Sequence, residues 1–264
     1  MGILALAAAG VVAAIYLYVV PTAGRMIAQR MPPHVEVRLG KAVVDQLAPR
    51  DEQCLDYGVA GPIGFILENL SKHVEGGAYQ FKAYVANRDQ INAFAAPGGS
   101  IVVYSGLLNK TRVPEELAAI FAHEITHVIQ KHGTHAVLRA LTFQTMMSFV
   151  LGEIDGAILQ LAGHLGDLRY AREDEQSADQ GAMLLMERSR LDPRAIASIY
   201  QALQQSSPEQ PGATSYLSSH PMLRDRVDAA REWASRAGYL PVPLLPNQPW
   251  PPKPKSPTAC LPPR

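Results

Sequence analysis

Two histidines four residues apart, with a glutamate beside the first, are the residues of this sequence best suited to chemistry. His123, Glu124 and His127 form the pattern H-E-x-x-H. On a helix, residues four apart lie on one face, one turn apart, so both imidazoles can bind one metal ion. Glu124 is turned partly off that face, where it can take a proton from a metal-activated water without binding the metal. The pattern predicts a catalytic zinc site with Glu124 as general base.

A catalytic zinc site also needs a third protein ligand and one open position. A later helical stretch offers five carboxylates: Glu173, Asp174, Glu175, Asp179 and Glu187. Glu175 and Asp179 share a helix face, and the small residues Ala178 and Ala182 would let two helices approach closely. We expect Glu175 to be the third ligand and Asp179 to hold a ligand histidine through its other ring nitrogen. From spacing alone, a solvated acidic helix face explains these carboxylates equally well.

The elements that must position these residues are mostly helices. Pro114 suits a first helical position, and apolar residues at helical spacing over residues 117–128 predict a buried face. We expect this helix to end at Gly133, because glycine often follows the last turn of a helix. A later helix, which carries the five carboxylates, is expected over about residues 168–188.

Upstream of the H-E-x-x-H helix the apolar residues change to a period of two. Residues 80–86, 91–94 and 101–104 alternate in this way, which predicts three short strands. The sequence Pro-Gly-Gly at residues 97–99 predicts the turn between the last two strands. The predicted fold class is therefore α+β, mostly helical, with a small antiparallel sheet.

Four ordered motifs resemble a known family of metallopeptidases. They are N-A-F-A-A-P-G-G at residues 92–99, the H-E-x-x-H helix, R-E-D-E-Q-S-A-D at residues 172–179, and S-H-P around His220 with Arg226 after it. In this order they resemble the membrane-associated gluzincins, which include HtpX-like heat-shock proteases, CAAX prenyl proteases, Oma-type mitochondrial proteases and periplasmic chaperone-proteases. The resemblance spans about residues 80–226 and does not cover the Pro-rich end of the chain.

The resemblance implies a zincin-like metallopeptidase domain with one zinc ion per chain. The family's third ligand is the glutamate of an R-x-x-E-x-x-A-D pattern, which falls on Glu175, with Asp179 as the aspartate of that pattern. The implied activity is that of an endopeptidase acting on misfolded or membrane-associated proteins. We expect the substrate to bind as an extended strand along residues 101–104, interpreted as an edge strand. Plain sheet core explains this strand equally well.

Two further histidines need a role. His220 is assigned to the catalytic residues, where it could stabilise the oxyanion or fill the open zinc position in a resting state. A buried structural histidine stays open as a third interpretation. His132 lies nine residues after His123, off the ligand face, and is interpreted as a cation at the helix C-terminus.

A zinc-containing chaperone or binding module with little turnover is the alternative function. Its zinc would be structural, and a structural zinc site is closed by four protein ligands. Such a site has no use for a base at the position of Glu124, so the sequence favours the peptidase.

Residues 3–20 are apolar and carry no charge. About 20 apolar residues span a bilayer, so we predict that residues 1–24 form an N-terminal membrane anchor or an uncleaved signal. A cleaved secretory signal is the other interpretation. Basic residues at Arg25, Arg30, Arg38 and Lys41 favour a cytoplasmic domain under the positive-inside rule. The family members that this chain resembles most are extracytoplasmic, and on that ground we expect the catalytic domain on the periplasmic side.

The rest of the chain divides into a metallopeptidase domain, residues 25–238, and a Pro-rich tail, residues 239–264. Ten of the last 24 residues are proline, a composition typical of a disordered or polyproline segment. Cys54 and Cys260 lie near opposite ends of the chain and are interpreted as unpaired thiols, although one disulfide is possible in an oxidising compartment. With 24 basic and 24 acidic residues, the chain has no charge excess that would suit a nucleic-acid partner.

Overall fold

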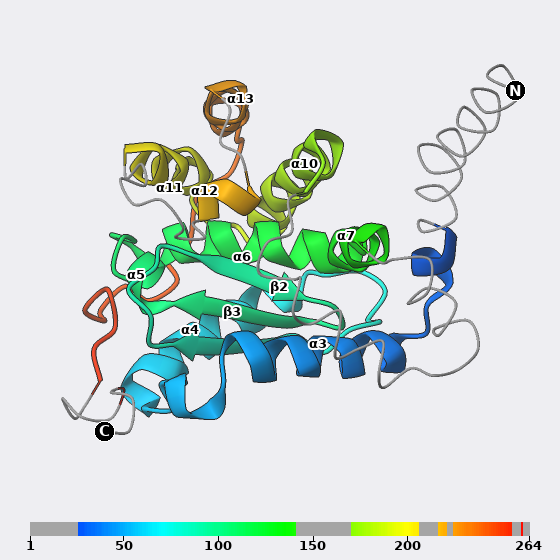
Figure 1. Ribbon diagram of the computed structural model, residues 1–264. Coiled ribbons are helices and arrows are strands. Elements are labelled where there is room, and N and C mark those ends of the chain that lie inside the picture. Colours follow the sequence, from blue (N-terminus) through cyan, green and yellow to red (C-terminus); the bar gives the residue numbers. More distant parts are fainter. Residues whose placement is uncertain (1–25, 141–169, 206–215, 221–223, 255–259, 261–264) are drawn as a thin grey trace, which may run out of the picture.

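The computed structural model describes residues 26–140, 170–205, 216–220, 224–254 and 260 (Figure 1). The predicted N-terminal anchor, residues 1–24, lies outside the described residues. Within the described ranges, no helix combines the length and the apolar character needed to cross a membrane.

Three short strands form one sheet with helices on both of its faces (Figure 1). The strands are β1 (Lys82–Ala86), β2 (Ala93–Ala96) and β3 (Ser100–Tyr104). The helices are α3 (Pro33–Leu47), the 3₁₀ turn η2 (Arg50–Glu52), α4 (Tyr57–Ser71), α5 (Ser105–Leu108), α6 (Pro114–Ile129), α7 (His132–Ala140), α10 (Arg172–Arg188), α11 (Arg194–Gln205), α12 (Tyr216–Ser219) and α13 (Arg224–Ser235). The predicted fold class, α+β and mostly helical with a small sheet, is confirmed.

The sheet is mixed, so the prediction of a wholly antiparallel sheet is wrong for one strand pair. The order is β1-β3-β2; β2 and β3 are antiparallel, whereas β1 runs parallel to β3. After β1 the chain reverses and places β2 at the far edge, and the turn at residues 97–99 then returns β3 between them. Because β3 is the central strand, the prediction that residues 101–104 offer an edge to a substrate is also wrong.

Alternate residues of β3 face two different hydrophobic cores. Ile101 and Val103 belong to the large core formed with α4, α6, α10 and α11. Val102 and Tyr104 belong to a smaller core with Val43 and Val44 of α3. The sheet therefore supports α6 on one face and is covered by α3 on the other.

Helix α6 begins at Pro114, as predicted, but does not end at Gly133. It ends at Ile129, and Lys131 takes a left-handed conformation with φ 58° before α7 begins at His132. The Lys131 amine stabilises this turn by donating to the backbone oxygen of Met31 at 2.9 Å. Gly133 is therefore the second residue of a new helix.

Helix α10 packs directly on α6 and brings its carboxylates to the H-E-x-x-H face. The predicted small residues Ala178 and Ala182 are fully buried in this contact. Gly181 lies against the side chain of Thr126, and a Cβ at Gly181 would collide with it. The close approach of the two helices thus depends on small side chains along one face of α10.

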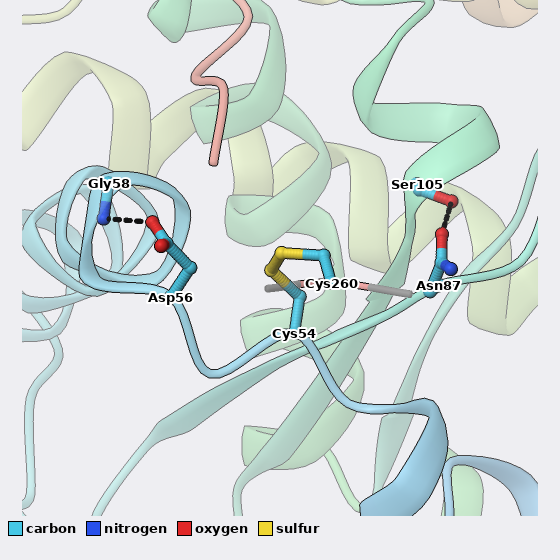
Figure 2. Close-up of a disulfide and its surroundings, with 6 residues drawn as sticks. All are labelled: Cys54, Asp56, Gly58, Asn87, Ser105 and Cys260. Carbon is cyan, nitrogen blue, oxygen red and sulfur yellow. Dashed lines mark hydrogen bonds between the residues drawn. A yellow bond between two sulfur atoms is a disulfide. The ribbon is translucent and has the colours of Figure 1, made fainter. Parts of the chain in front are cut away.

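The Pro-rich tail contains no helix or strand over residues 239–254, but it makes contacts with the start of α6. The backbone N–H of Leu244 donates to Glu115 at 2.9 Å, and the Trp250 indole donates to Thr111 at 2.9 Å. This path over the start of α6 leads the tail back toward the other end of the chain. Figure 2 shows the outcome, a disulfide between Cys54 and Cys260. The interpretation of two unpaired thiols is therefore wrong.

Candidate metal centre

The three H-E-x-x-H residues lie on the buried side of α6. His123, Glu124 and His127 are each at most 1% exposed. Because the two histidines are one helical turn apart, their Nε2 atoms lie 3.0 Å from each other and face the same point. Residues 117–128 are apolar at most other positions, so this face of α6 concentrates polar groups inside a hydrophobic core.

Glu175 of α10 faces the same point. One of its carboxylate oxygens lies 3.4 Å from His127 Nε2, and the other lies 3.6 Å from His123 Nε2. His220, which follows α12, places its Nδ1 2.8 Å from Glu175 and 3.2 Å from His123 Nε2. One ligand atom from each of these four residues lies within 4.8 Å of the others. The structure thus brings together His123, His127, Glu175 and His220, which all came from the sequence.

Imidazole nitrogen and carboxylate oxygen are ligands that zinc prefers. The electrostatics of the four groups suit a cation. Burial disfavours the ionised form of Glu175, but the nearby charge of His220 and hydrogen bonds with His127 and His220 hold its pKa well below the ordinary value. Burial also lowers the pKa of His127 well below its ordinary value, which keeps its imidazole neutral and able to bind a metal. The donor set and its protonation therefore fit a zinc ion.

Asp179 lies one turn after Glu175 and contacts the first histidine. Its Oδ1 is 3.1 Å from His123 Nδ1, so it can accept the proton of the ring nitrogen that faces away from the cluster. Arg226 of α13 donates to both oxygens of Asp179, at 2.6 and 2.7 Å, and forms an ion pair with Glu175 at 2.7 Å. Although burial alone would raise it, the pKa of Asp179 is lowered by hydrogen bonds with His123 and Arg226.

Glu124 lies beside the cluster and does not belong to it. Burial raises the pKa of its carboxyl, against the opposing effect of the charges on His220 and His123 and of the Ala95 backbone amide. Neither carboxylate oxygen makes a hydrogen bond of normal geometry with the described residues. His220 Nε2, 3.6 Å from Glu124, and the buried Tyr216 hydroxyl also lack partners among those residues. Buried polar atoms need a partner, and water or a substrate carbonyl at this point would supply one.

Sequence reasoning missed the environment of His132 and the part played by two tyrosines. His132 is buried, and burial lowers its pKa from 6.5 to about 4, so it is not the helix-terminal cation that was expected. Tyr200 of α11 donates to Asp179 at 2.6 Å. The Tyr216 ring stacks on His220, with ring centroids 4.5 Å apart. Their positions depend on how distant helices pack, and no local spacing in the sequence signals them.

The comparison with known proteins agrees with this geometry. Residues 63–234, more than half of the chain, match the family described as Peptidase family M48. The chain belongs to peptidase family M48. Its similarity to this family confirms the predicted metallopeptidase class and zinc as the cofactor, since the metal-binding group lies within the matched residues.

Several known proteins are similar to this chain over more than half of its length. It is 33% identical to the beta-barrel assembly-enhancing protease of Yersinia pestis, over 59% of this chain and 35% of that protein. It is 27% identical to the protein of the same name from Escherichia coli K12, over 76% of this chain and 44% of the relative. It is 29% identical to the mitochondrial metalloendopeptidase OMA1 of Arabidopsis thaliana, over 59% of this chain and 32% of the relative. The chain thus spans less than half the length of these relatives.

Proposed function

We propose that this chain is a zinc-dependent endopeptidase in which His123, His127 and Glu175 bind the metal and Glu124 is the general base. The observation that carries the proposal is the convergence of the two Nε2 atoms and the Glu175 carboxylate on one buried point, with Glu124 beside it. When bound, zinc supplies a Lewis acid that polarises a carbonyl and makes water more acidic.

The raised pKa of Glu124 suits its role in proton transfer. A carboxylate with a pKa shifted toward neutrality accepts a proton from the attacking water and later returns it to the leaving amine. Its oxygens make no normal hydrogen bonds with the described residues, so they are available to a water molecule. The chaperone alternative is less well supported, because it leaves this buried, raised-pKa carboxylate without a purpose.

We propose that the substrate main chain pairs with β2, which is an edge strand of the sheet. The Tyr104 N–H donates to the backbone oxygen of Asn92 at 3.0 Å. In an antiparallel pair, every second residue directs its N–H and C=O toward the neighbouring strand, so the N–H and C=O groups of Ala93 and Ala95 point away from β3. The Ala95 amide also lies close enough to Glu124 to lower its pKa. A peptide added at this edge by main-chain hydrogen bonds would therefore pass the general base.

A cavity of about 410 Å³ adjoins the proposed ligands between α10 and α13. Its lining includes Tyr170, Glu175, Gln176, Met183 and Arg226. This volume matches the side chain and neighbouring backbone of a bound peptide, and its mixed apolar and polar lining suits a protein substrate. Misfolded or membrane-associated proteins are the proposed substrates, because they expose extended segments.

We further propose that the domain works on the extracytoplasmic side of a membrane, held there by residues 1–24. The Cys54–Cys260 disulfide supports this location, because disulfides persist in oxidising compartments. Protease digestion of intact spheroplasts tests the orientation: degradation of the domain is the expected result. Protection until the membrane is opened would contradict it.

Metal analysis of purified variants tests the catalytic proposal. Glu124→Gln should retain one zinc per chain and lose hydrolysis of an unstructured casein-like substrate, whereas His123→Ala and Glu175→Ala should lose the zinc. Glu173→Ala is the matched control, since this exposed glutamate lies on the same helix and should leave both zinc and activity unchanged. Zinc retained in His123→Ala and Glu175→Ala would refute the ligand assignment.

A further inference from the structure

The two histidines of the H-E-x-x-H motif, His123 and His127, contact different groups through the ring nitrogen that faces away from the proposed metal. A metal-binding histidine nearly always donates its second ring N–H to an acceptor, which fixes its tautomer and orientation. For His123 that acceptor is Asp179, 3.1 Å from Nδ1. For His127 the described structure places another imidazole there, with His132 Nδ1 lying 3.0 Å from His127 Nδ1.

We propose that His132 is the positioning residue of His127, a neutral imidazole whose Nδ1 accepts the Nδ1–H of His127. This inference deepens the proposed zinc site and rests on it. His127 Nε2 faces the cluster and must be unprotonated there to bind a cation, so the proton of the neutral ring is on Nδ1. Two nitrogens 3.0 Å apart need one donor and one acceptor, and His132 Nδ1 is therefore the acceptor.

The surroundings of His132 agree with that tautomer. If Nδ1 accepts, the ring proton of His132 is on Nε2 and needs an acceptor of its own. Ser177 Oγ lies 3.3 Å from this nitrogen and donates its own hydrogen to the Asp174 carbonyl oxygen at 3.0 Å, which leaves its lone pairs free to accept. The Asp174 carboxylate lies 3.8 Å from the same nitrogen. A directed chain thus runs from His127 through His132 to Ser177.

The break between α6 and α7 is what turns His132 toward His127. In a continuous helix, a residue five positions later would lie about 140° around the axis and would face away. The left-handed residue Lys131 redirects the chain, and its amine forms an ion pair at 3.0 Å with the buried Glu36. Glu36 also accepts from Thr134 at 2.7 Å, which ties the first turn of α7 to the same carboxylate. These contacts of Lys131 and Thr134 with Glu36 therefore fix the position of His132.

Zinc affinity of the metal-free proteins, measured by competition with chelators of graded strength, tests the proposal. His132→Ala should weaken zinc binding by about 10–100-fold, the usual loss when the group behind a ligand histidine is removed. His132→Gln should recover most of that loss, because its amide oxygen can accept from His127 while its NH₂ donates to Ser177. His132→Leu, which fills similar space without hydrogen bonds, should not recover it. Ser177→Ala should cause a smaller loss.

His135→Ala is the matched control, because His135 is a second buried histidine on α7. Like His132, it lines a cavity of about 550 Å³. It should leave zinc affinity unchanged. Wild-type affinity in a folded His132→Ala protein, or equal affinities for His132→Gln and His132→Leu, would overturn the proposal. Such a result together with zinc loss in His123→Ala would leave the metal site itself in place, whereas zinc retained in His123→Ala would show that the site is elsewhere.

Discussion

The disulfide between Cys54 and Cys260 should contribute a large share of the stability of this domain. The two cysteines are separated by 206 of the 264 residues, so the cross-link closes a loop that contains most of the chain. For a loop of this length, the loss of chain entropy in the unfolded state amounts to about 5 kcal/mol. Fraying of the tail in the reduced native state would lower this effect, and the hydrogen bonds to Glu115 and Thr111 oppose such fraying. Replacing both cysteines by serine should therefore reduce the free energy of unfolding by about 2–5 kcal/mol.

Guanidinium denaturation of the oxidised wild type, the reduced wild type and the double serine variant measures this effect. The reduced and variant proteins should unfold at the same, lower denaturant concentration. Thiol titration of the denatured, oxidised protein should find no free thiol from this pair. Zinc content should not change, because Glu115 lies eight residues before His123, about 12 Å along α6. Two reactive thiols in the oxidised protein, or equal midpoints for wild type and variant, would refute the reasoning.

Three further predictions concern the metal centre. Arg226→Gln should destabilise the metal-free protein by about 3–5 kcal/mol at pH 7, because it leaves Asp179 buried without its guanidinium partner. Since Arg226 helps to lower the pKa of Asp179, the difference in unfolding free energy between wild type and variant should shrink as the pH falls below about 4. A difference that stays constant with pH would contradict this prediction. His220→Ala should keep its zinc and change the rate of peptide hydrolysis. The rate should rise if His220 blocks the open zinc position, and it should fall by about 10²–10³-fold if His220 stabilises the oxyanion. An unchanged rate would show that His220 has no catalytic role. Tyr216→Phe removes a buried hydroxyl that makes no hydrogen bond with the described residues, so it should change the free energy of unfolding by less than about 1 kcal/mol, and a larger loss would contradict this.

The two histidines proposed as ligands could be selected from the sequence because the pattern that contains them is local. His123 and His127 are one turn apart on one helix, and any helix through them brings the imidazoles together. Glu175 comes from a second helix, and its spacing from Asp179 did not separate a ligand from a solvated acidic face. The R-x-x-E-x-x-A-D resemblance selected Glu175, and the structure places it 3.4 Å from His127.

The features that were predicted wrongly depend on partners far away in the chain. Alternation in residues 80–86 identifies a strand but contains no information on its neighbour or direction, so the parallel pairing of β1 with β3 could not be deduced. The proline content of residues 239–264 suggests a disordered or polyproline segment and does not reveal that Leu244 and Trp250 pack near the start of α6. Once the tail follows that path, Cys260 meets Cys54, and a pairing that sequence separation had made improbable becomes a consequence of packing (Figure 2).

The charges buried at the centre favour a bound cation. Glu124, Glu175 and Asp179 are three buried carboxyls, and Arg226 supplies the guanidinium that pairs with two of them. With neutral imidazoles, full ionisation would leave two uncompensated negative charges, and burying unpaired charge is costly. The metal-free protein reduces that excess by raising the pKa of Glu124 and of His220, the latter because Glu175 and Glu124 outweigh the effect of burial. A divalent cation removes the same excess directly, so the charge of the site, and not only its geometry, matches zinc.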